Sequence, residues 1–206
     1  YQTNLAQRLH IPLQHDPHKV FSHLVNQNPV GFACFLETSW GSIIGGSPER
    51  LIRLNKRRAN TRPIAGTRKR GQTSIRDNQL KSELLTDPKE LAEHSMLIDL
   101  MRNDLGKVCQ PGTVEITKDY QITTYEHVHH LESEVEGLLE PQYDGLDLIG
   151  ATFPGGTVTG VPKISTINII RSLEPHQRGV YTGSFGYVAH SGNMDINILI
   201  RKTDTA

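Results

Sequence analysis

The sequence predicts an α+β fold organised as one unit. Blocks with strand character and blocks with helical character intermingle along the 206 residues, without the regular strand–helix–strand repeat of parallel α/β proteins. We find no internal duplication and no low-complexity tract that would divide the chain. The length suffices for one substantial core or two small ones. We therefore expect a single α+β unit over residues 1–206, with antiparallel strands joined by tight turns.

The first third of the chain is predicted to hold one helix followed by strands. Asp16-Pro17 is an N-cap followed by proline at the first helical position, and apolar residues then recur at helical spacing to about Asn28. The stretches "VGFACFLE" and "GSIIGGSPERLIRL" combine β-formers with glycine punctuation, which favours antiparallel strands. The next segment, "RRANTRPIAGTRKRG" at 57–71, is basic and rich in turn formers. We interpret it as a loop that is either solvated or facing an anion.

The remaining elements follow from caps and periodicity. A helical pattern begins at Asp77, breaks at Asp87-Pro88, and resumes in a second helix that Asp87 caps, with Glu90 at the third position and Gly106 as its stop. Alternation predicts strands in 112–139, and the stretches 143–152 and 164–173 are predicted to be helices. Residues 179–202 close the chain as a hairpin with "HSGN" as its turn.

The composition excludes several classes of partner. Lysine plus arginine equals aspartate plus glutamate at 22 each, so no overall field would attract nucleic acid or an anionic membrane. No apolar run approaches the roughly 20 residues of a membrane span. The two cysteines, Cys34 and Cys109, form neither a disulfide framework nor a zinc spacing, which fits a reducing cytoplasm. A small-molecule partner is expected, and the strand-like starts and stops of the sequence predict a domain that is incomplete at both ends.

The stretch "FPGGTVTGVPKIS", residues 153–165, is the most unusual in composition. Glycines can present backbone N–H groups, and the start of the following helix adds unpaired donors, so the segment could bind an anion. Gly155 and Gly160 have the spacing of a nucleotide-binding P-loop, but Val-Pro-Lys stands where that motif needs Gly-Lys-Ser/Thr. A carboxylate or other small anion remains possible. The alternative is a glycine-rich turn that only lets a helix pack on a sheet.

Two clusters of ionisable residues raise the question of a metal. Glu90, Glu93 and His94 lie within one helical turn, and carboxylates so placed suit Mg²⁺, which takes one or two of them and fills its other positions with water or substrate oxygens. The alternative is a solvated charged helix face. In "HVHH", His127 and His129 share one strand face, but neither a cysteine nor an HExxH partner lies nearby, so zinc is disfavoured.

Read together, these stretches resemble the chorismate-utilising enzymes, which include the large subunits of anthranilate synthase and aminodeoxychorismate synthase and the isochorismate and salicylate synthases. Nearly the whole chain carries the resemblance, through "YQTNLAQR", "GGSPERL", "RPIAGTRKRG", "AEHSMLIDLMRNDLG", "VHHLESEVEG", "FPGGTVTGVPK", "YTGSFGY" and "GNMDINILIR". It implies an α+β fold of antiparallel sheets flanked by helices, with chorismate and Mg²⁺ bound in a deep cleft.

The resemblance also implies roles for individual residues. Glu93 resembles a direct Mg²⁺ ligand and Glu90 a ligand through water, while Glu49 resembles the general acid that protonates the departing C4 hydroxyl group. His130 matches the family's histidine beside the substrate ring. Gln2 stands where the isochorismate and salicylate branch carries a lysine that activates water, which points to ammonia as the nucleophile.

The substrate-binding positions follow from the same resemblance. Tyr181 and Arg201 look like the pair that grips the enolpyruvyl carboxylate of chorismate. The other positions that match pocket-lining residues of the family are Ala65, Gly66, Thr67, Thr159 and Gly160. Family chains continue into a segment that brings a second metal-binding glutamate, a lysine and further carboxylate donors, so residues 1–206 alone are expected to be inactive or nearly so.

The product is predicted by a balance of local motifs. "FPGG", "MRNDLG", "VHHL" and "YTGSFGY" resemble aminodeoxychorismate synthase, which makes 4-amino-4-deoxychorismate for folate synthesis with ammonia from a glutamine amidotransferase subunit. Ala65 instead matches anthranilate synthase, because many aminodeoxychorismate synthases carry a nucleophilic lysine there. We favour aminodeoxychorismate synthase and keep anthranilate synthase as the alternative. A non-catalytic anion-binding module is a further alternative, which the retained Glu49, Glu90 and Glu93 argue against.

Overall fold

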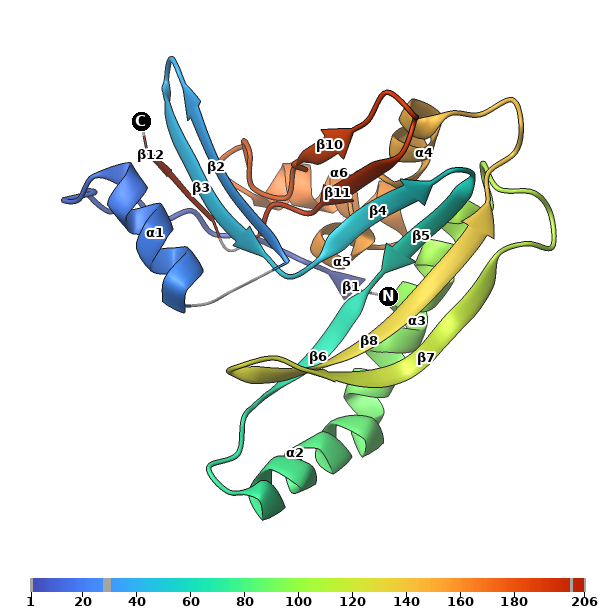
Figure 1. Ribbon diagram of the computed structural model, residues 1–206, viewed down its shortest axis with the longest axis horizontal. Helices are drawn as coiled ribbons and strands as arrows, with labels where there is room; N and C mark the ends of the chain where they lie inside the picture. Colours follow the sequence, from blue (N-terminus) through green and yellow to red (C-terminus); the bar gives the residue numbers. More distant parts are fainter. Residues whose placement is uncertain (1, 28–30, 201, 206) are drawn as a thin grey trace.

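A computed structural model confirms the α+β class, with antiparallel sheets flanked by helices (Figure 1). It describes residues 2–27 and 31–200, and the backbone of 202–205. Within these residues the strands form three separate sheets, and every strand pair is antiparallel.

The largest sheet has seven strands and forms the centre of the molecule. Its strand order is β10-β11-β4-β5-β8-β6, with β7 on the second side of β8. These strands are β4 (Arg50–Asn55), β5 (Arg58–Arg62), β6 (Ile64–Lys69), β7 (Glu115–Thr124), β8 (Val128–Leu138), β10 (Gly186–Val188) and β11 (Met194–Asn197). The β10–β11 hairpin turns at the predicted "HSGN", where the amide of Ala189 donates to the carbonyl of Asn193.

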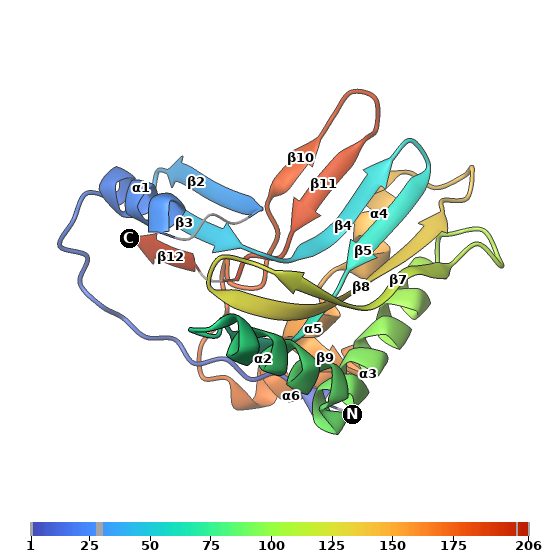
Figure 2. The ribbon, with the colours of Figure 1, turned by 60° about the horizontal axis from the view of Figure 1, so that its bottom comes forward.

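Two smaller sheets lie beside it. One is a three-stranded sheet of β2 (Phe32–Thr38), β3 (Gly41–Ser47) and β12 (Lys202–Thr205), against which α1 (Pro17–Gln27) packs. The other pairs β1 (Gln2–Thr3) with β9 (Gly160–Val161). In both views, α1 and the three-stranded sheet lie at the opposite side of the molecule from α3 (Figures 1 and 2).

The remaining helices pack against the large sheet or against the β1–β9 pair. They are α2 (Ser74–Thr86), α3 (Pro88–Leu105), α4 (Gly145–Thr152), α5 (Gly156–Thr159) and α6 (Lys163–Leu173). As predicted, α3 begins at Asp87, whose carboxylate accepts from the amides of Lys89 and Glu90, and ends at Gly106. Its apolar face, with Ile98, Met101 and Leu105, packs into the main core with residues of β4, β5 and β8.

The predicted loop at 57–71 is wrong, because this basic segment forms β5 and β6. The arginines of this segment can lie in or beside a sheet because acidic side chains from other elements form ion pairs with them. Arg62 pairs with Glu132, with Nη2 to Oε2 at 2.5 Å, and Arg70 pairs with Asp77, with Nε to Oδ1 at 2.9 Å. Helix α2 also starts earlier than the predicted Asp77, because the Thr73 hydroxyl caps it at Ser74.

No helix in the described part of the chain is long and apolar enough to cross a membrane. Cys34 and Cys109 are free and buried.

Candidate active site

Glu49 lies at the corner between β3 and β4 and is buried, with 6% of its surface exposed. Its backbone is fixed on both sides, since its amide donates to the Ser47 hydroxyl at 3.2 Å and its carbonyl accepts from the amide of Ile198 at 3.1 Å. Burial, helped by the nearby Glu132 carboxylate, raises the pKa of Glu49 to about 7. The carboxyl group can therefore hold a proton near neutral pH.

Glu132 on β8 is the centre of a polar network beside Glu49. Its carboxylate pairs with Arg62 and accepts hydrogen bonds from the hydroxyls of Thr123, at 2.9 Å, and Tyr125, at 2.8 Å. Glu132 is 2% exposed, so these partners stabilise its charge inside the protein. Sequence reasoning missed this group. The spacing of Glu132 in the sequence is not distinctive, and its hydroxyl partners come close only through the pairing of β7 with β8.

His130 and Thr67 lie opposite each other on the paired strands β8 and β6. The Thr67 hydroxyl and His130 Nδ1 are 2.9 Å apart, and the ring of Tyr125 packs edge-on at 5.4 Å from the histidine ring. Ala65 is buried in the same strand pair. Gly66, between Ala65 and Thr67, has a φ of 69° at an irregularity in the β6–β8 register. Only glycine accepts this conformation readily.

Gln2 reaches Glu93 directly. The amide Nε2 of Gln2 on β1 donates to Oε1 of Glu93 on α3 at 2.9 Å, although 91 positions separate the two residues. Glu93 is half-buried, and Lys89 lies 3.9 Å from its other oxygen. The two residues that the sequence assigned to the nucleophile and to the metal therefore lie in contact.

Glu90 lies one turn before Glu93 on α3 and faces strand β6. Its Oε1 accepts from Arg68 at 3.2 Å, and Arg68 also pairs with Asp87 at 2.8 Å. A Cβ on Gly66 would lie 3.0 Å from the second carboxylate oxygen of Glu90, which brings the predicted metal and pocket positions together.

The donor chemistry of Glu90 and Glu93 fits Mg²⁺, since both are carboxylates on successive turns of one helix and hard oxygen atoms are the ligands that this ion prefers. Among the described residues, no group of three or more His, Cys, Asp or Glu side chains is arranged to hold a metal. A two-carboxylate site would need water or substrate oxygens at the other positions. The predicted exclusion of zinc at "HVHH" stays a prediction, and His129 Nε2 there contacts Asp77 at 2.8 Å.

His94, on the same helix, points into the protein rather than toward the carboxylates. It is fully buried, its Nε2 lies 2.7 Å from the Ser133 hydroxyl, and its ring packs edge-on against Tyr120. Burial lowers its pKa to about 4, so it is neutral at physiological pH. These contacts give His94 a structural place between α3 and the β7–β8 pair.

The glycine-rich stretch 153–162 folds back on the protein as a short helix and a two-residue strand. A Cβ on Gly156 would overlap the side chain of Leu100, and one on Gly160, where φ is 113°, would overlap the carbonyl of Gln2. Thr159 is buried and its hydroxyl donates to the carbonyl of Gly155 at 3.0 Å. Close packing explains these glycines without a ligand, and the pocket roles of Thr159 and Gly160 stay predictions.

Tyr181 stands apart from the other predicted residues. It lines a cavity of about 580 Å³ between the chain after β1 and the end of α6, and of the predicted site residues that the structure describes, Tyr181 alone lines it. The guanidinium of Arg178, held by Glu174, lies 5.8 Å from the centre of its ring. Arg201, its predicted partner, lies outside the described residues.

Comparison with known proteins gives consistent matches. A family model for chorismate binding enzymes matches residues 1–203. An anthranilate synthase component I-like protein of Synechocystis is 52% identical over 89% of this chain and 38% of its own length. Aminodeoxychorismate synthase component 1 of Bacillus subtilis is 45% identical over 98% of this chain and 43% of its own length.

The fold matches as well. The crystal structure of anthranilate synthase component I from Streptococcus pneumoniae superposes with a TM-score of 0.85 and 38% identity, over 92% of this chain and 42% of that one. The chain thus spans between 38% and 43% of the length of these three proteins.

Proposed function

Because this chain belongs to the family of chorismate-binding enzymes, we propose that it is part of a synthase that aminates chorismate to 4-amino-4-deoxychorismate. The ammonia would come from a glutamine amidotransferase subunit, and the product would enter folate synthesis. The two free, buried thiols are consistent with the cytoplasm as the compartment.

The observation that carries the proposal is Glu49. A buried carboxyl group whose pKa is about 7 is a suitable general acid at physiological pH, because about half of it is protonated there. In the proposed reaction, ammonia supplies the electron pair for the new C–N bond and the C4–O bond breaks. The departing oxygen takes the proton of Glu49 and leaves as water.

The remaining predicted residues would bind and orient the reactants. The amide of Gln2 would lie beside the bound ammonia while it holds Glu93 in place. A neutral amide removes no proton, which suits a nucleophile that needs no base. The Thr67 hydroxyl would fix the ring of His130 beside the substrate. Tyr181 and Arg201 would bind the enolpyruvyl carboxylate.

Glu90 and Glu93 would hold Mg²⁺. When bound, the ion would offset the charge of the ring carboxylate of chorismate. Arg68 now neutralises Glu90, so that ion pair would have to loosen as the metal binds.

Anthranilate synthase is the second candidate, favoured by one observation. Ala65 is a buried alanine in the strand beside Glu49, and it offers no nucleophile for an enzyme–substrate bond. The relatives carry both names, which leaves the product to experiment.

The test uses the natural full-length protein with chorismate, Mg²⁺ and ammonium chloride, with products identified by mass spectrometry. We expect a product in which an amino group replaces the hydroxyl group and the enolpyruvyl group is retained. Anthranilate with released pyruvate would establish the second candidate. Chorismate recovered unchanged would contradict both and favour a binding module, and the Glu49→Gln variant, assayed in parallel, controls for contaminating activity.

A further inference from the structure

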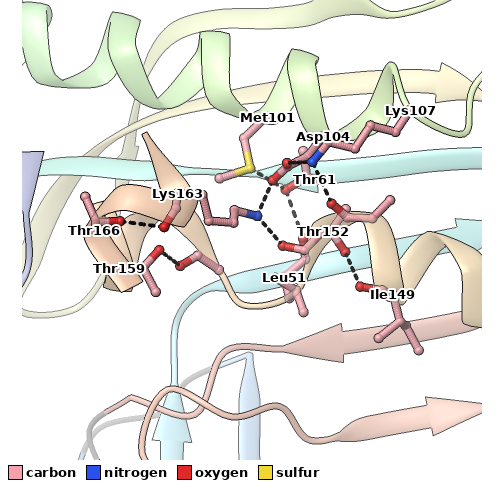
Figure 3. Close-up of polar contacts among 12 residues, drawn as sticks. Leu51, Thr61, Met101, Asp104, Lys107, Ile149, Thr152, Thr159, Lys163 and Thr166 are labelled. Atoms are coloured by element: carbon pink, nitrogen blue, oxygen red, sulfur yellow. Dashed lines mark hydrogen bonds and ion pairs between the residues drawn. The ribbon is translucent and has the colours of Figure 1, made fainter. Parts of the chain in front are cut away.

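A buried ion pair joins α3 to the start of α6. Asp104, near the end of α3, is 1% exposed. Its Oδ2 lies 2.5 Å from Nζ of Lys163, and its Oδ1 lies 2.7 Å from Nζ of Lys107 (Figure 3). The side chain of Lys163 is 12% exposed, whereas that of Lys107 is 49% exposed, so Lys163 forms the buried contact.

Lys163 also closes the glycine-rich stretch at its two ends. Its Nζ donates to the carbonyl of Thr152 at 2.7 Å, and Thr152 is the last residue of α4 (Figure 3). Thr152 and Lys163 are the residues that flank 153–162. One ammonium group therefore ties both ends of this stretch together and fixes them to α3.

The stretch in turn carries β1. The amide of Asn4 donates to the carbonyl of Thr159 at 3.1 Å, and Gln2 and Thr3 pair with Val161 and Gly160. Since Gln2 also contacts Glu93 on α3, the path from Asp104 through Lys163, 153–162 and β1 returns to the helix on which it began.

Stability alone does not require a charged pair at this position. Burying two charges carries a desolvation cost, and apolar side chains of similar volume often stabilise a protein as well or better. An ion pair with a carbonyl as third partner has directional geometry that apolar contacts lack. The role of the ion pair is therefore to be found in the directional geometry that it imposes and not in stability alone.

We propose that Asp104 and Lys163 are positioning residues, which hold the stretch 153–162 and β1 at the place on α3 where the Gln2 amide reaches Glu93. The proposal rests on the proposed function, because it assigns the pair to the site that Glu90 and Glu93 would form with Mg²⁺. Neither residue contacts substrate in this assignment.

The decisive variant is the double substitution Asp104→Leu with Lys163→Met, which replaces the pair with apolar side chains and is expected to fold. Three measurements are made on the natural full-length protein: steady-state kinetics for kcat and KM of chorismate, the Mg²⁺ concentration for half-maximal activity, and hydrogen exchange of the Asn4 and Gly160 amides. Lys107→Met is the matched control, since Lys107 contacts the same carboxylate and the carbonyl of Ala151 but neither of the residues that flank 153–162.

We expect the double variant to lose about 100-fold in kcat, the size of effect that a small misplacement of reacting groups produces, with a smaller change in KM. Its Mg²⁺ requirement should rise, and the two amides should exchange about tenfold faster. Lys107→Met should match the wild type in all three. Wild-type kcat, Mg²⁺ requirement and exchange in a folded double variant would overturn the inference and show that the pair only fills space.

The two proposals fail in different ways. If the wild-type protein itself does not aminate chorismate, the proposed function is wrong, whatever the exchange data show. If the wild type is active and the double variant is equally active, the positioning role is wrong. If the double variant does not fold, Lys163→Arg, which keeps the charge but changes its reach, takes its place, with unchanged exchange at Asn4 and Gly160 as the contradicting result.

Discussion

Two buried carboxyl groups in this molecule have opposite surroundings. Asp104, between α3 and α6, contacts two lysines, whereas Glu49, at the β3–β4 corner, takes part in no ion pair within the described part of the chain. Burial, helped by the nearby Glu132 carboxylate, raises its pKa to about 7. A buried acid with a cation is a fixed charge that holds elements together. A buried acid without one keeps its proton to neutral pH and is available for chemistry.

The largest expected effect is that of Glu49→Gln on turnover. Glutamine has nearly the same shape but cannot donate an acidic proton, so we expect kcat to fall about 10²–10⁴-fold, the usual contribution of a general acid. In the wild type, turnover should decline as pH rises above about 7, because Glu49 is then ionised. Steady-state kinetics between pH 6 and about 9 on the natural full-length protein would check both points. If the variant keeps wild-type turnover, Glu49 takes no part in the chemistry. The contrast with Asp104 would then have no functional meaning.

Asp104→Asn should instead act on stability. The substitution leaves the Lys163 ammonium buried without its counter-charge, and breaking a buried pair in this way costs about 3–5 kcal/mol of unfolding free energy. Urea unfolding followed by circular dichroism measures it. Lys107→Met, at the half-exposed partner, should cost less than about 1 kcal/mol. Equal losses for the two variants would show that the buried pair is worth no more than the surface one.

The same contrast predicts a pH dependence of stability. The pKa of Glu49 is about 7 in the folded protein against an ordinary value of 4.5. Between these values the unfolded chain has released the proton and the folded chain still binds it, so the free energy of unfolding should fall as pH rises from 4.5 to 7. At about 1.4 kcal/mol per pH unit, the fall is about 3 kcal/mol. Comparing wild type with Glu49→Gln over this range isolates the effect, since the variant lacks that proton. Parallel curves would mean that Glu49 titrates normally.

Local signals predicted most of the elements, because caps and periodicity act within a few residues. Asp87 begins α3 and Gly106 ends it as the sequence indicates, and the "HSGN" turn closes its hairpin. The prediction of a loop at 57–71 was wrong for the opposite reason. The strands of this segment are stabilised by partners such as Glu132 and Glu136, which lie far along the chain, and basic composition alone gives no sign of them.

The site was predictable only through the family resemblance. Gln2 and Glu93 are 91 positions apart, and Asp104 and Lys163 are 59 apart, so no spacing rule could have brought either pair together. The sequence did mark "FPGGTVTGVPKIS" as unusual, but its glycines are explained by close packing on Leu100, Ile198 and Gln2. A glycine that admits a ligand and a glycine that admits a neighbouring side chain look the same in a sequence.

Gly156→Ala measures how tightly that packing is set, and it has the smallest expected effect. The added methyl group would overlap the buried side chain of Leu100 on α3, so the stretch 153–162 must shift or Leu100 must leave its position. Overpacking of this kind costs about 1–3 kcal/mol of unfolding free energy. Gly150→Ala, in the neighbouring helix α4, is the matched control, because a methyl group there meets nothing within 4 Å and should stabilise the helix by up to about 1 kcal/mol. A Gly156→Ala variant as stable as the wild type would show that the stretch moves freely on α3, and an ion pair from Lys163 would then have little left to position.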